Sequence, residues 1–248
     1  MEPILEIVEP RLLPGMVADE VIHSISDAIA DRGRCSLVLS GGSSPGAIYR
    51  LLSHPPRVSE VEWDKVHIYW GDERWVPAED NQSNFRMADE TFLSHLSFPQ
   101  PHVHPVDVSA ATPQASADAY ADTIRELEGV SVGELPAFDV VLLGMGEDGH
   151  IASLFPGSEV LGREDGSLCH AVKQPGGEGY RVTLSKNALF SAHHVIFIVR
   201  GEQKSSIVQR VLEGDEPPET LPAKFANSAT GKVTWMLDSA SASKLNRK

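Results

Sequence analysis

Short apolar runs alternate with amphipathic stretches along this chain, and that alternation constrains the fold more than any other feature of the sequence. Residues 17–29 repeat apolar side chains at helical spacing up to Gly33, and an apolar run follows at 35–39. A second helix is expected to begin near Pro45. Further strands are predicted at 66–70, 138–143, 168–172, 180–184, 195–199 and 233–237, and further helices at 116–128 and 202–212. Strands separated by helices predict an α/β fold with a largely parallel sheet and helices on both faces.

The organisation of the chain favours a single domain. The sequence has no internal repeat and no low-complexity tract. Two Pro-rich stretches, 98–113 and 213–222, have neither the length nor the composition of a flexible linker, so they are interpreted as loops. We therefore expect one α/β domain over residues 1–248.

The charge of the chain argues against several classes of partner. Lys and Arg number 21 and Asp and Glu 35, which leaves a net charge of −14. Nucleic acid and anionic lipid bind through basic surfaces, so neither partner is expected. An anionic small molecule could bind only where a few cations or backbone N–H groups reverse the field locally.

Cysteine usage and the N-terminus bear on the compartment. Cys35 and Cys169 lie far apart in apolar runs without a CxxC motif, which is typical of buried thiols in a reduced cytoplasm. The N-terminus has no basic region followed by an apolar stretch, and no window reaches the ~20 apolar residues of a membrane span. We expect a cytoplasmic protein, either a monomer or a small homo-oligomer.

Ligands of open parallel sheets bind beyond the carboxyl ends of the strands, which directs attention to the residues after each predicted strand. The first such segment reads Ser40-Gly41-Gly42-Ser43-Ser44-Pro45-Gly46. Ser44 is a candidate N-cap, and Pro45 suits the first helical position. Free N–H groups at a helix start, together with serine hydroxyls, can bind a phosphate. The alternative is a plain Gly/Ser turn between a strand and a helix.

The spacing from Gly41 to Gly46 mimics a nucleotide-binding P-loop, but the match is incomplete. Ala47 and Ile48 stand where that motif requires Lys followed by Ser or Thr. The lysine for the terminal phosphates and the hydroxyl for magnesium are therefore missing. A monophosphate fits this segment better than a nucleoside triphosphate.

The second segment, Gly71-Asp72-Glu73-Arg74-Trp75, places two carboxylates and a guanidinium directly after a strand. Such groups are costly to bury unless they are paired or used. Arg74 is a candidate for contact with an anionic oxygen, and one carboxylate could orient a catalytic group. An exposed turn with a salt bridge is the alternative.

The third segment, 144–149, matches the dinucleotide pattern G-x-G-x-x-G after a strand. Glu147 and Asp148 would face a pyrophosphate with like charges, and Pro156-Gly157 cuts short the helix that should hold it. The dinucleotide interpretation is therefore the weaker one. Asp148 and His150 remain, and a histidine beside a carboxylate is the usual general base, although a structural hydrogen bond is equally open.

The other histidines do not predict a metal site. His102 and His104, and the adjacent His193 and His194, have no acidic or cysteine partners at ligand spacing. We therefore expect no metal site.

Taken together, these segments resemble the 6-phosphogluconolactonases. The resemblance covers about residues 10–240, and its motifs stand in the family's order. They are 40–45, 70–77, 84–88, 144–156 and 181–184. The resemblance implies a Rossmann-like sheet with a smaller added subregion. It also implies hydrolysis of 6-phospho-D-glucono-1,5-lactone to 6-phospho-D-gluconate in the pentose phosphate pathway, without a required metal or organic cofactor. Ser44 and Gly46 depart from the residues most frequent in the family, which affects only fine phosphate affinity.

The resemblance also implies roles for individual residues. His150 would be the base on water and then the acid to the ring oxygen, with Asp148 fixing its tautomer. Arg74 would hold the lactone carbonyl or a hydroxyl, with N–H groups of 144–149 as further donors. Asp72 would act directly or brace the site. The phosphate-binding residues would be Gly41, Gly42, Ser43, Ser44, Arg181 and Lys204, the last of which could instead be an ordinary surface lysine.

Two other functions remain open on the same fold. Aminosugar-phosphate deaminases share the Gly-rich loop, the Asp-Glu pair and Asp-Gly-His, but they carry a Glu where this chain has Phe155 and an aromatic residue where it has Arg74. A non-catalytic sugar-phosphate sensor is the third possibility, and such sensors usually carry a DNA-binding element that this sequence does not show.

Overall fold

A computed structural model of the chain describes residues 2–42, 44–96, 102–177 and 179–246. The six strands of the main sheet are all parallel and lie in the order β1-β9-β8-β5-β2-β3. Their bounds are β1 Ile4–Val8, β2 Cys35–Leu39, β3 Val66–Trp70, β5 Val140–Leu143, β8 His194–Val199 and β9 Lys232–Asp238. The predicted α/β fold with an open, mostly parallel sheet is confirmed.

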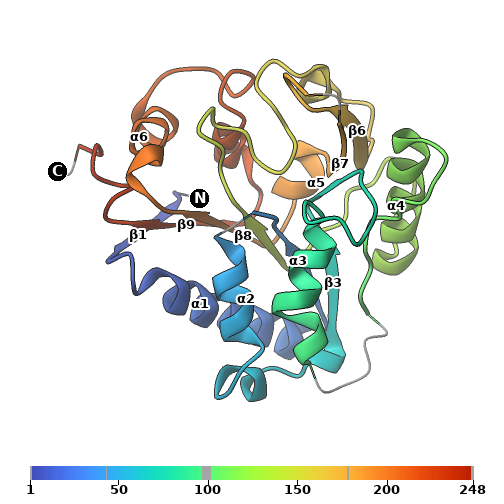
Figure 1. Cartoon of the computed structure of the whole chain (residues 1–248), viewed down its shortest axis with the longest axis horizontal. Helices are drawn as coiled ribbons and strands as arrows, with labels where there is room; N and C mark the ends of the chain where they lie inside the picture. Colours follow the sequence, from blue (N-terminus) through green and yellow to red (C-terminus); the bar gives the residue numbers. More distant parts are fainter. Residues whose placement is uncertain (1, 43, 97–101, 178, 247–248) are drawn as a thin grey trace.

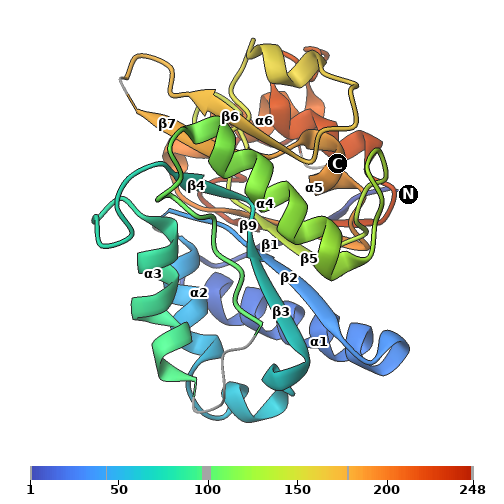
Figure 2. The same ribbon diagram turned by 90° about the vertical axis from the view of Figure 1, so that its right-hand side faces the viewer.

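Helices cover both faces of this sheet, as Figures 1 and 2 show. The α-helices are α1 Leu13–Arg32, α2 Pro45–Leu52, α3 Asn84–Thr91, α4 Pro113–Glu128, α5 Lys186–Phe190 and α6 Ser205–Glu213. The 3-10 turns include Glu159–Gly162, Glu202–Lys204 and Pro222–Ser228. Helices α1, α2 and α3 lie on one side of the sheet, whereas α5, α6 and a second, smaller sheet lie on the other (Figure 1).

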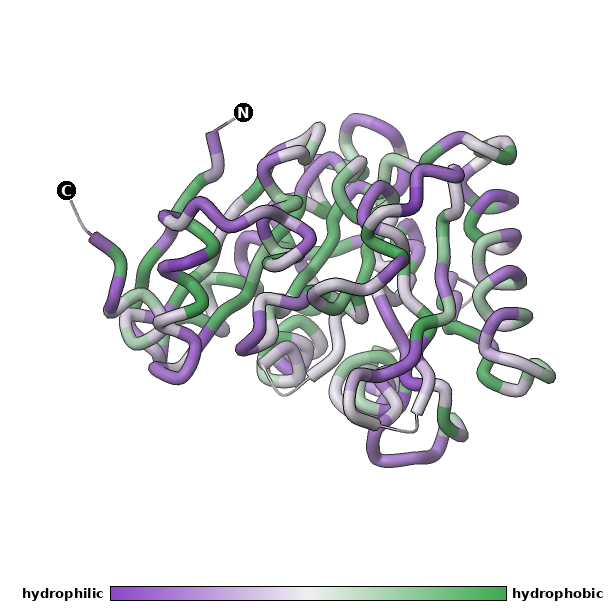
Figure 3. The backbone as a smooth tube through the Cα atoms, turned by 90° about the horizontal axis from the view of Figure 1, so that it is seen from above, coloured by the Kyte–Doolittle hydropathy of each residue, from purple (hydrophilic) through white to green (hydrophobic). Residues whose placement is uncertain are grey.

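Alternate residues of each central strand enter two different cores. In β2, Leu37 and Leu39 pack with α1 and α2, whereas Val38 packs with the helices and strands of the opposite side. Successive side chains of a strand point to opposite faces, so a strand that is covered on both sides must be apolar throughout. All five residues of β2 are accordingly buried. In Figure 3 the apolar strands run through the middle of the molecule, and α4 alternates between polar and apolar residues.

The second sheet is antiparallel and corrects one detail of the prediction. Strands β6 Cys169–Lys173 and β7 Tyr180–Leu184 leave the parallel sheet and pair with β4 Asp72–Arg74 in the order β4-β7-β6. The connection from β6 to β7 spans residues 174–179, which is far too short for the crossover that parallel strands need. These strands are the smaller added subregion that the family resemblance implies.

Two strands were not predicted from the sequence. β1 is an edge strand of the main sheet that bonds only to β9, and its first three residues are exposed, so its apolar pattern is weak. β4 has only three residues, all charged, and exists because it pairs with β7. Segment 71–74 is therefore not the exposed turn that remained as the alternative.

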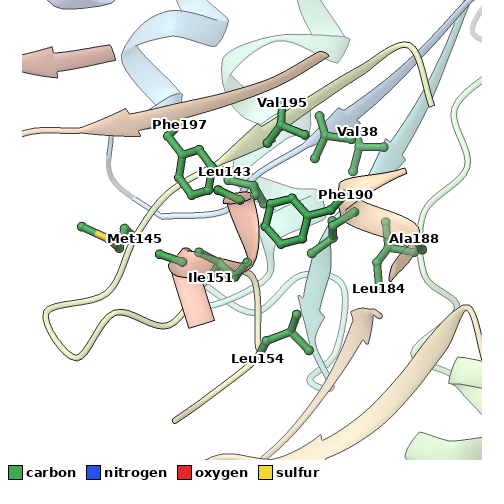
Figure 4. Packing of buried hydrophobic residues seen from close by; sticks show 14 of the residues in the cluster. Val38, Leu143, Met145, Ile151, Leu154, Leu184, Ala188, Phe190, Val195 and Phe197 are labelled. Carbon is green, nitrogen blue, oxygen red and sulfur yellow. The ribbon is translucent and has the colours of Figure 1, made fainter. Parts of the chain in front are cut away.

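The main core is shared by the parallel sheet and the small sheet. Figure 4 shows Val38, Leu143 and Phe197 of the main sheet packed near Leu184 of β7 and Phe190 of α5. The same cluster takes in Ile151 and Leu154, which are fully buried. Among the described residues, no helix is long and apolar enough to cross a membrane.

Candidate active site

A pocket of about 400 Å³ opens beyond the carboxyl ends of β2, β5 and β8 and is closed on one side by the small sheet. Strands β2 and β5 are neighbours in the sheet, but the chain continues from β2 to β3 on one side of this pair and from β5 to β8 on the other. The loops after β2 and β5 therefore run in opposite directions at this point. This reversal is where open α/β sheets bind ligands. Ser40 joins the two loops, because its Oγ accepts a hydrogen bond from the Gly144 N–H at 3.2 Å.

The loop after β2 contributes Gly41, Gly42 and Ser44 to the pocket. Ser43 lies outside the described residues. Helix α2 begins at Pro45 as predicted, but Ser44 does not cap it through its side chain. Ser44 already has helical dihedrals (φ −72°, ψ −44°), and a side-chain cap needs an extended residue at that position. The Ser44 hydroxyl is thus left to line the pocket.

Strand pairing brings Asp72, Arg74 and Arg181 together. Arg74 lies opposite Arg181 in the β4–β7 register, and Asp72, two residues away, shares its face of the strand. Arg181 Nη1 stands 3.9 Å from Asp72 Oδ2, and its Nη2 donates to Gln174 Oε1 at 2.9 Å. Burial and the neighbouring charge of Arg74 lower the pKa of Arg181. Two guanidinium groups held this close create a local field that favours an anion.

Glu73 points to the other face of β4 and caps helix α3. Its carboxylate accepts hydrogen bonds from the backbone N–H groups of Asn84 and Phe85, both at 2.7 Å, at the start of that helix. A carboxylate at a helix N-terminus satisfies donors that have no partner within the helix. Burial raises the pKa of Glu73 despite these bonds. The second carboxylate of the segment is therefore structural, whereas Asp72 faces the pocket.

Asp148 and His150 are paired directly. His150 Nδ1 lies 2.6 Å from Asp148 Oδ1, and the His150 backbone N–H donates to the same oxygen at 3.1 Å. Burial alone would raise the pKa of Asp148, but these bonds and the charge of the ring lower it overall. His150 lines the pocket, and Asp148 holds its ring through Nδ1.

The glycine pattern 144–149 serves this histidine rather than a dinucleotide. A Cβ on Gly146 would lie 2.1 Å from His150 Nδ1, so only glycine leaves room for the ring. No helix follows the loop; the chain forms a short bridge between Ile151 and Leu154 instead. The helix N-terminus that would bind a pyrophosphate is therefore missing.

The N–H groups of this loop are largely engaged within the protein. Gly144 donates to Ser40 Oγ, Gly146 to the His150 carbonyl at 2.8 Å and Gly149 to the Gly146 carbonyl at 3.2 Å. These three groups are not free to bind a developing oxyanion. Arg74, whose side chain lines the pocket, is the better candidate for that donor.

The loop after β8 adds two more cations, Arg200 and Lys204. Lys204 ends the 3-10 turn Glu202–Lys204 and is half-buried, and burial lowers its pKa against the opposing effect of Glu147 and Asp148. Gly201 holds the loop, because its N–H donates to both carboxylate oxygens of Asp238 at 3.0 Å. The charged residues that line the pocket are thus four cations, one carboxylate and His150.

Several pocket residues were not singled out in the sequence. Arg200 and Gln174 directly follow β8 and β6, so the rule that directed attention to strand ends would have found both. Asn84 and Ser153 lie in the family motifs 84–88 and 144–156, but nothing in the sequence indicates that both bond to Asp72.

The remaining histidines are engaged elsewhere. His104 and His102 stack on His67 at the edge strand β3, where His67 Nδ1 lies 3.1 Å from His104 Nε2. His194 bonds Ser24 and Thr234. Within the described ranges, no group of three or more His, Cys, Asp or Glu side chains has the geometry of a metal site.

An open parallel sheet whose switch point carries a glycine-rich loop, clustered cations and a carboxylate–histidine pair defines an α/β protein with a site for a small anionic ligand. The model of a family described as glucosamine-6-phosphate isomerases/6-phosphogluconolactonase matches residues 9–235. This chain belongs to that family.

Individual relatives agree. A 6-phosphogluconolactonase of Synechocystis sp. is 34% identical over 220 residues, 88% of either chain. The solved structure of 6-phosphogluconolactonase from Trypanosoma cruzi superposes with a TM-score of 0.87 at 31% identity and covers 99% of this chain and 98% of that one. A solved monomeric glucosamine-6-phosphate deaminase shares the fold with a TM-score of 0.81 at 20% identity, over 98% of this chain and 99% of its own.

Proposed function

We propose that this protein hydrolyses 6-phospho-D-glucono-1,5-lactone to 6-phospho-D-gluconate, as the 6-phosphogluconolactonases to which it is similar are named for doing. The observation that carries the proposal is the Asp148–His150 pair, which faces a pocket lined by four cations. Lactone hydrolysis needs a base for water, and the phosphate of the substrate needs positive charge. The pocket supplies both.

The base in this reaction is His150. The Asp148 carboxylate accepts a hydrogen bond from His150 Nδ1. This bond selects the tautomer with its proton on Nδ1 and leaves Nε2 free to take a proton. His150 removes a proton from water as the water oxygen bonds to the lactone carbonyl carbon. The same proton then passes to the ring oxygen as the bond between that oxygen and the carbonyl carbon breaks.

The negative charge that develops on the carbonyl oxygen is stabilised by the Arg74 guanidinium, which lines the pocket. Preorganised donors of this kind are often the largest single contribution to catalysis. Asp72 holds Arg181 in place and braces the site, since its carboxylate is already bonded to Ser153 and approached by Arg181.

The phosphate is bound by Gly41, Gly42 and Ser44 of the loop after β2 and by Arg181 and Lys204, with Arg200 as an additional cation. A chain of net charge −14 attracts a dianion only through such a local cluster. Charge-assisted hydrogen bonds from arginine are about twice as strong as neutral ones, which favours this arrangement over backbone donors alone.

Phe155 distinguishes this reaction from sugar-phosphate deamination. Its ring centroid lies 5.0 Å from that of His150, at the position where the related deaminases carry a glutamate. A phenyl ring neither donates nor accepts a proton, so the group that would assist ring opening is missing. The lactonase reaction needs no such group.

The test is a coupled assay with freshly prepared 6-phosphogluconolactone, with glucosamine 6-phosphate offered in parallel. We expect rapid hydrolysis of the lactone above its spontaneous rate and no release of ammonia from the amino sugar. Ammonia release would establish the deaminase instead. Tight binding of either compound without turnover would establish a sensor.

We further propose that the protein works in the cytoplasm and that residues 1–248 form one domain. Both cysteines are buried free thiols, as expected in a reduced compartment. A single hydrophobic cluster takes in Val141 of the main sheet and Val182 of the small sheet, which supports one folding unit.

A further inference from the structure

Ser153 joins the loop that carries His150 to the strand that carries Asp72. Its side chain is completely buried, and its Oγ donates to Asp72 Oδ2 at 2.6 Å. The two residues are 81 positions apart in the sequence. The Ser153 backbone N–H also bonds the Thr183 hydroxyl at 3.3 Å, and Thr183 lies opposite Asp72 in the β4–β7 register. Ser153 is therefore attached to the small sheet at two points.

The loop itself adopts a conformation that must be held in place. Ala152 has φ +47° and is the one non-glycine residue with a positive φ in the described part of the chain. Side chains other than glycine rarely adopt this region, and strained residues persist only where their surroundings hold them. Ala152 lines the pocket and lies directly between His150–Ile151 and Ser153.

Apolar packing anchors the loop but does not orient it. Ile151 and Leu154 are fully buried in the main core, as Figure 4 shows. Such packing is non-directional, whereas a short buried hydrogen bond constrains both distance and angle. The bond from Ser153 to Asp72 is the directional contact that ties the loop to the face of β4 and β7 where Arg74 and Arg181 stand.

We propose that Ser153 is a positioning residue, which through Asp72 sets the distance of His150 from the arginine pair. The effect on turnover rests on the proposed lactone hydrolysis, but the effect on His150 itself does not. Positioning matters because a misplacement of about 1 Å can cost roughly a hundredfold in rate. The proposal assigns Ser153 no contact with the substrate.

Ser36 provides a matched control. It is also a buried serine whose hydroxyl donates to a buried aspartate, Asp139 Oδ2, at 3.1 Å. It is the second residue of β2, toward the end of the strand that lies away from the pocket. Ser36→Ala should therefore lose stability without changing the site.

The kinetic experiment compares Ser153→Ala, Ser153→Cys and Ser36→Ala with the unchanged protein. We expect Ser153→Ala to lower kcat about tenfold to a hundredfold with KM changed less than about threefold. Ser153→Cys keeps the volume but donates weakly, so it should follow Ser153→Ala. Combination with Asp72→Ala should add much less than its separate effect, because both changes break the same bond. Additive losses, or equal losses in Ser36→Ala, would overturn the proposal.

A spectroscopic experiment keeps the proposal testable if the substrate has been misassigned. The ring signals of His150, identified by their disappearance in His150→Gln, are followed by NMR over a pH titration. Ser153→Ala should shift both the signals and their titration midpoint, whereas Ser36→Ala should leave them in place. An unchanged His150 signal in Ser153→Ala refutes the positioning role even where no turnover can be measured. A shifted signal without lactone hydrolysis by the unchanged protein would reject only the proposed function.

Discussion

Asn84 lies directly beneath Gly41: a Cβ atom built on Gly41 would stand 2.0 Å from Asn84 Oδ1. Asn84 cannot move aside at little cost, because it is buried and its Nδ2 donates to the Asp72 backbone carbonyl at 2.8 Å. The loop after β2 and the strand that carries Asp72 and Arg74 are therefore in contact through Asn84, and only glycine at position 41 leaves room for the Asn84 side chain.

Gly41→Ala should displace the phosphate loop and lower kcat/KM for the phosphorylated lactone by roughly tenfold to a hundredfold. The control is Gly46→Ala in helix α2, where the new Cβ would meet Met87 Sδ at an ordinary 3.6 Å. That change should be neutral or slightly stabilising. In Gly41→Ala/Asn84→Gly the clash is gone, so the double variant should be no worse than Asn84→Gly alone. Unchanged kinetics in Gly41→Ala would show that the loop yields freely.

His150→Ala should lower kcat by about a hundredfold to ten-thousandfold, which is the usual contribution of a general base. The thermal midpoint should stay close to that of the unchanged protein, since the ring is partly exposed and lines the pocket. Initial rates corrected for spontaneous hydrolysis and a thermal melt together test this. Near-normal turnover by a well-folded variant is incompatible with the assigned role.

Arg181→Ala should weaken kcat/KM for the phosphorylated lactone by roughly tenfold to a hundredfold, because hydrogen bonds to charged groups contribute ~1.5–3 kcal/mol each. Hydrolysis of the unphosphorylated gluconolactone should hardly change. Arg32→Ala is the control: it breaks an ion pair with Asp139 (2.7 Å) at the other end of the sheet, and any loss there should affect both lactones alike. Equal losses for both lactones in Arg181→Ala would show that Arg181 does not bind the phosphate.

Chelation should leave the rate unchanged. The reaction derived above is carried by side chains, and within the described ranges no cluster of His, Cys, Asp or Glu could hold a metal. The measurement is the initial rate after exhaustive dialysis against a chelator, with and without added zinc or magnesium. An activity lost on dialysis and restored by either ion would contradict the prediction.

The free energy of unfolding should fall as the pH drops from about 6.5 to about 4. Burial lowers the pKa of His67, His104 and His194 to about 4, from an ordinary value of 6.5. Between these values the unfolded chain binds protons that the folded protein does not, so acid favours unfolding. Above pH 6.5 both states are neutral at these rings and the effect is absent.

His194→Gln tests one contribution to this slope, and His194 is buried with its Nε2 bonded to Thr234 Oγ1 at 2.9 Å. One proton fewer should reduce the slope by at most about 1.4 kcal/mol per pH unit. Urea denaturation at several pH values between 7 and 4.5 gives the slope for both proteins. Identical slopes would mean that His194 is protonated in the folded state as easily as in the unfolded chain.

Much of the fold could be predicted because it is encoded in short windows. The bounds of β2, β3 and β7 coincide with their apolar runs, and Gly33 ends α1 in the left-handed conformation (φ +76°) that favours glycine. Pro45 likewise begins α2. Burial on both faces of a strand and the stereochemistry of helix ends are local properties, so the residues themselves reveal them.

The sequence by itself determined the order of the elements, the parallel sheet and the position of the pocket at its strand ends. Only the tertiary structure decided which of the residues at those ends meet. The pairing of β4 with β7 sets Arg74 beside Arg181, and Ser153 reaches Asp72 across 81 positions. Such contacts depend on how distant segments pack. The sequence around Ser153 or Asn84 does not reveal which distant residue lies opposite. A short segment of sequence predicts which residues are buried and where the chain turns, but the partner of a buried polar group is set by the whole fold.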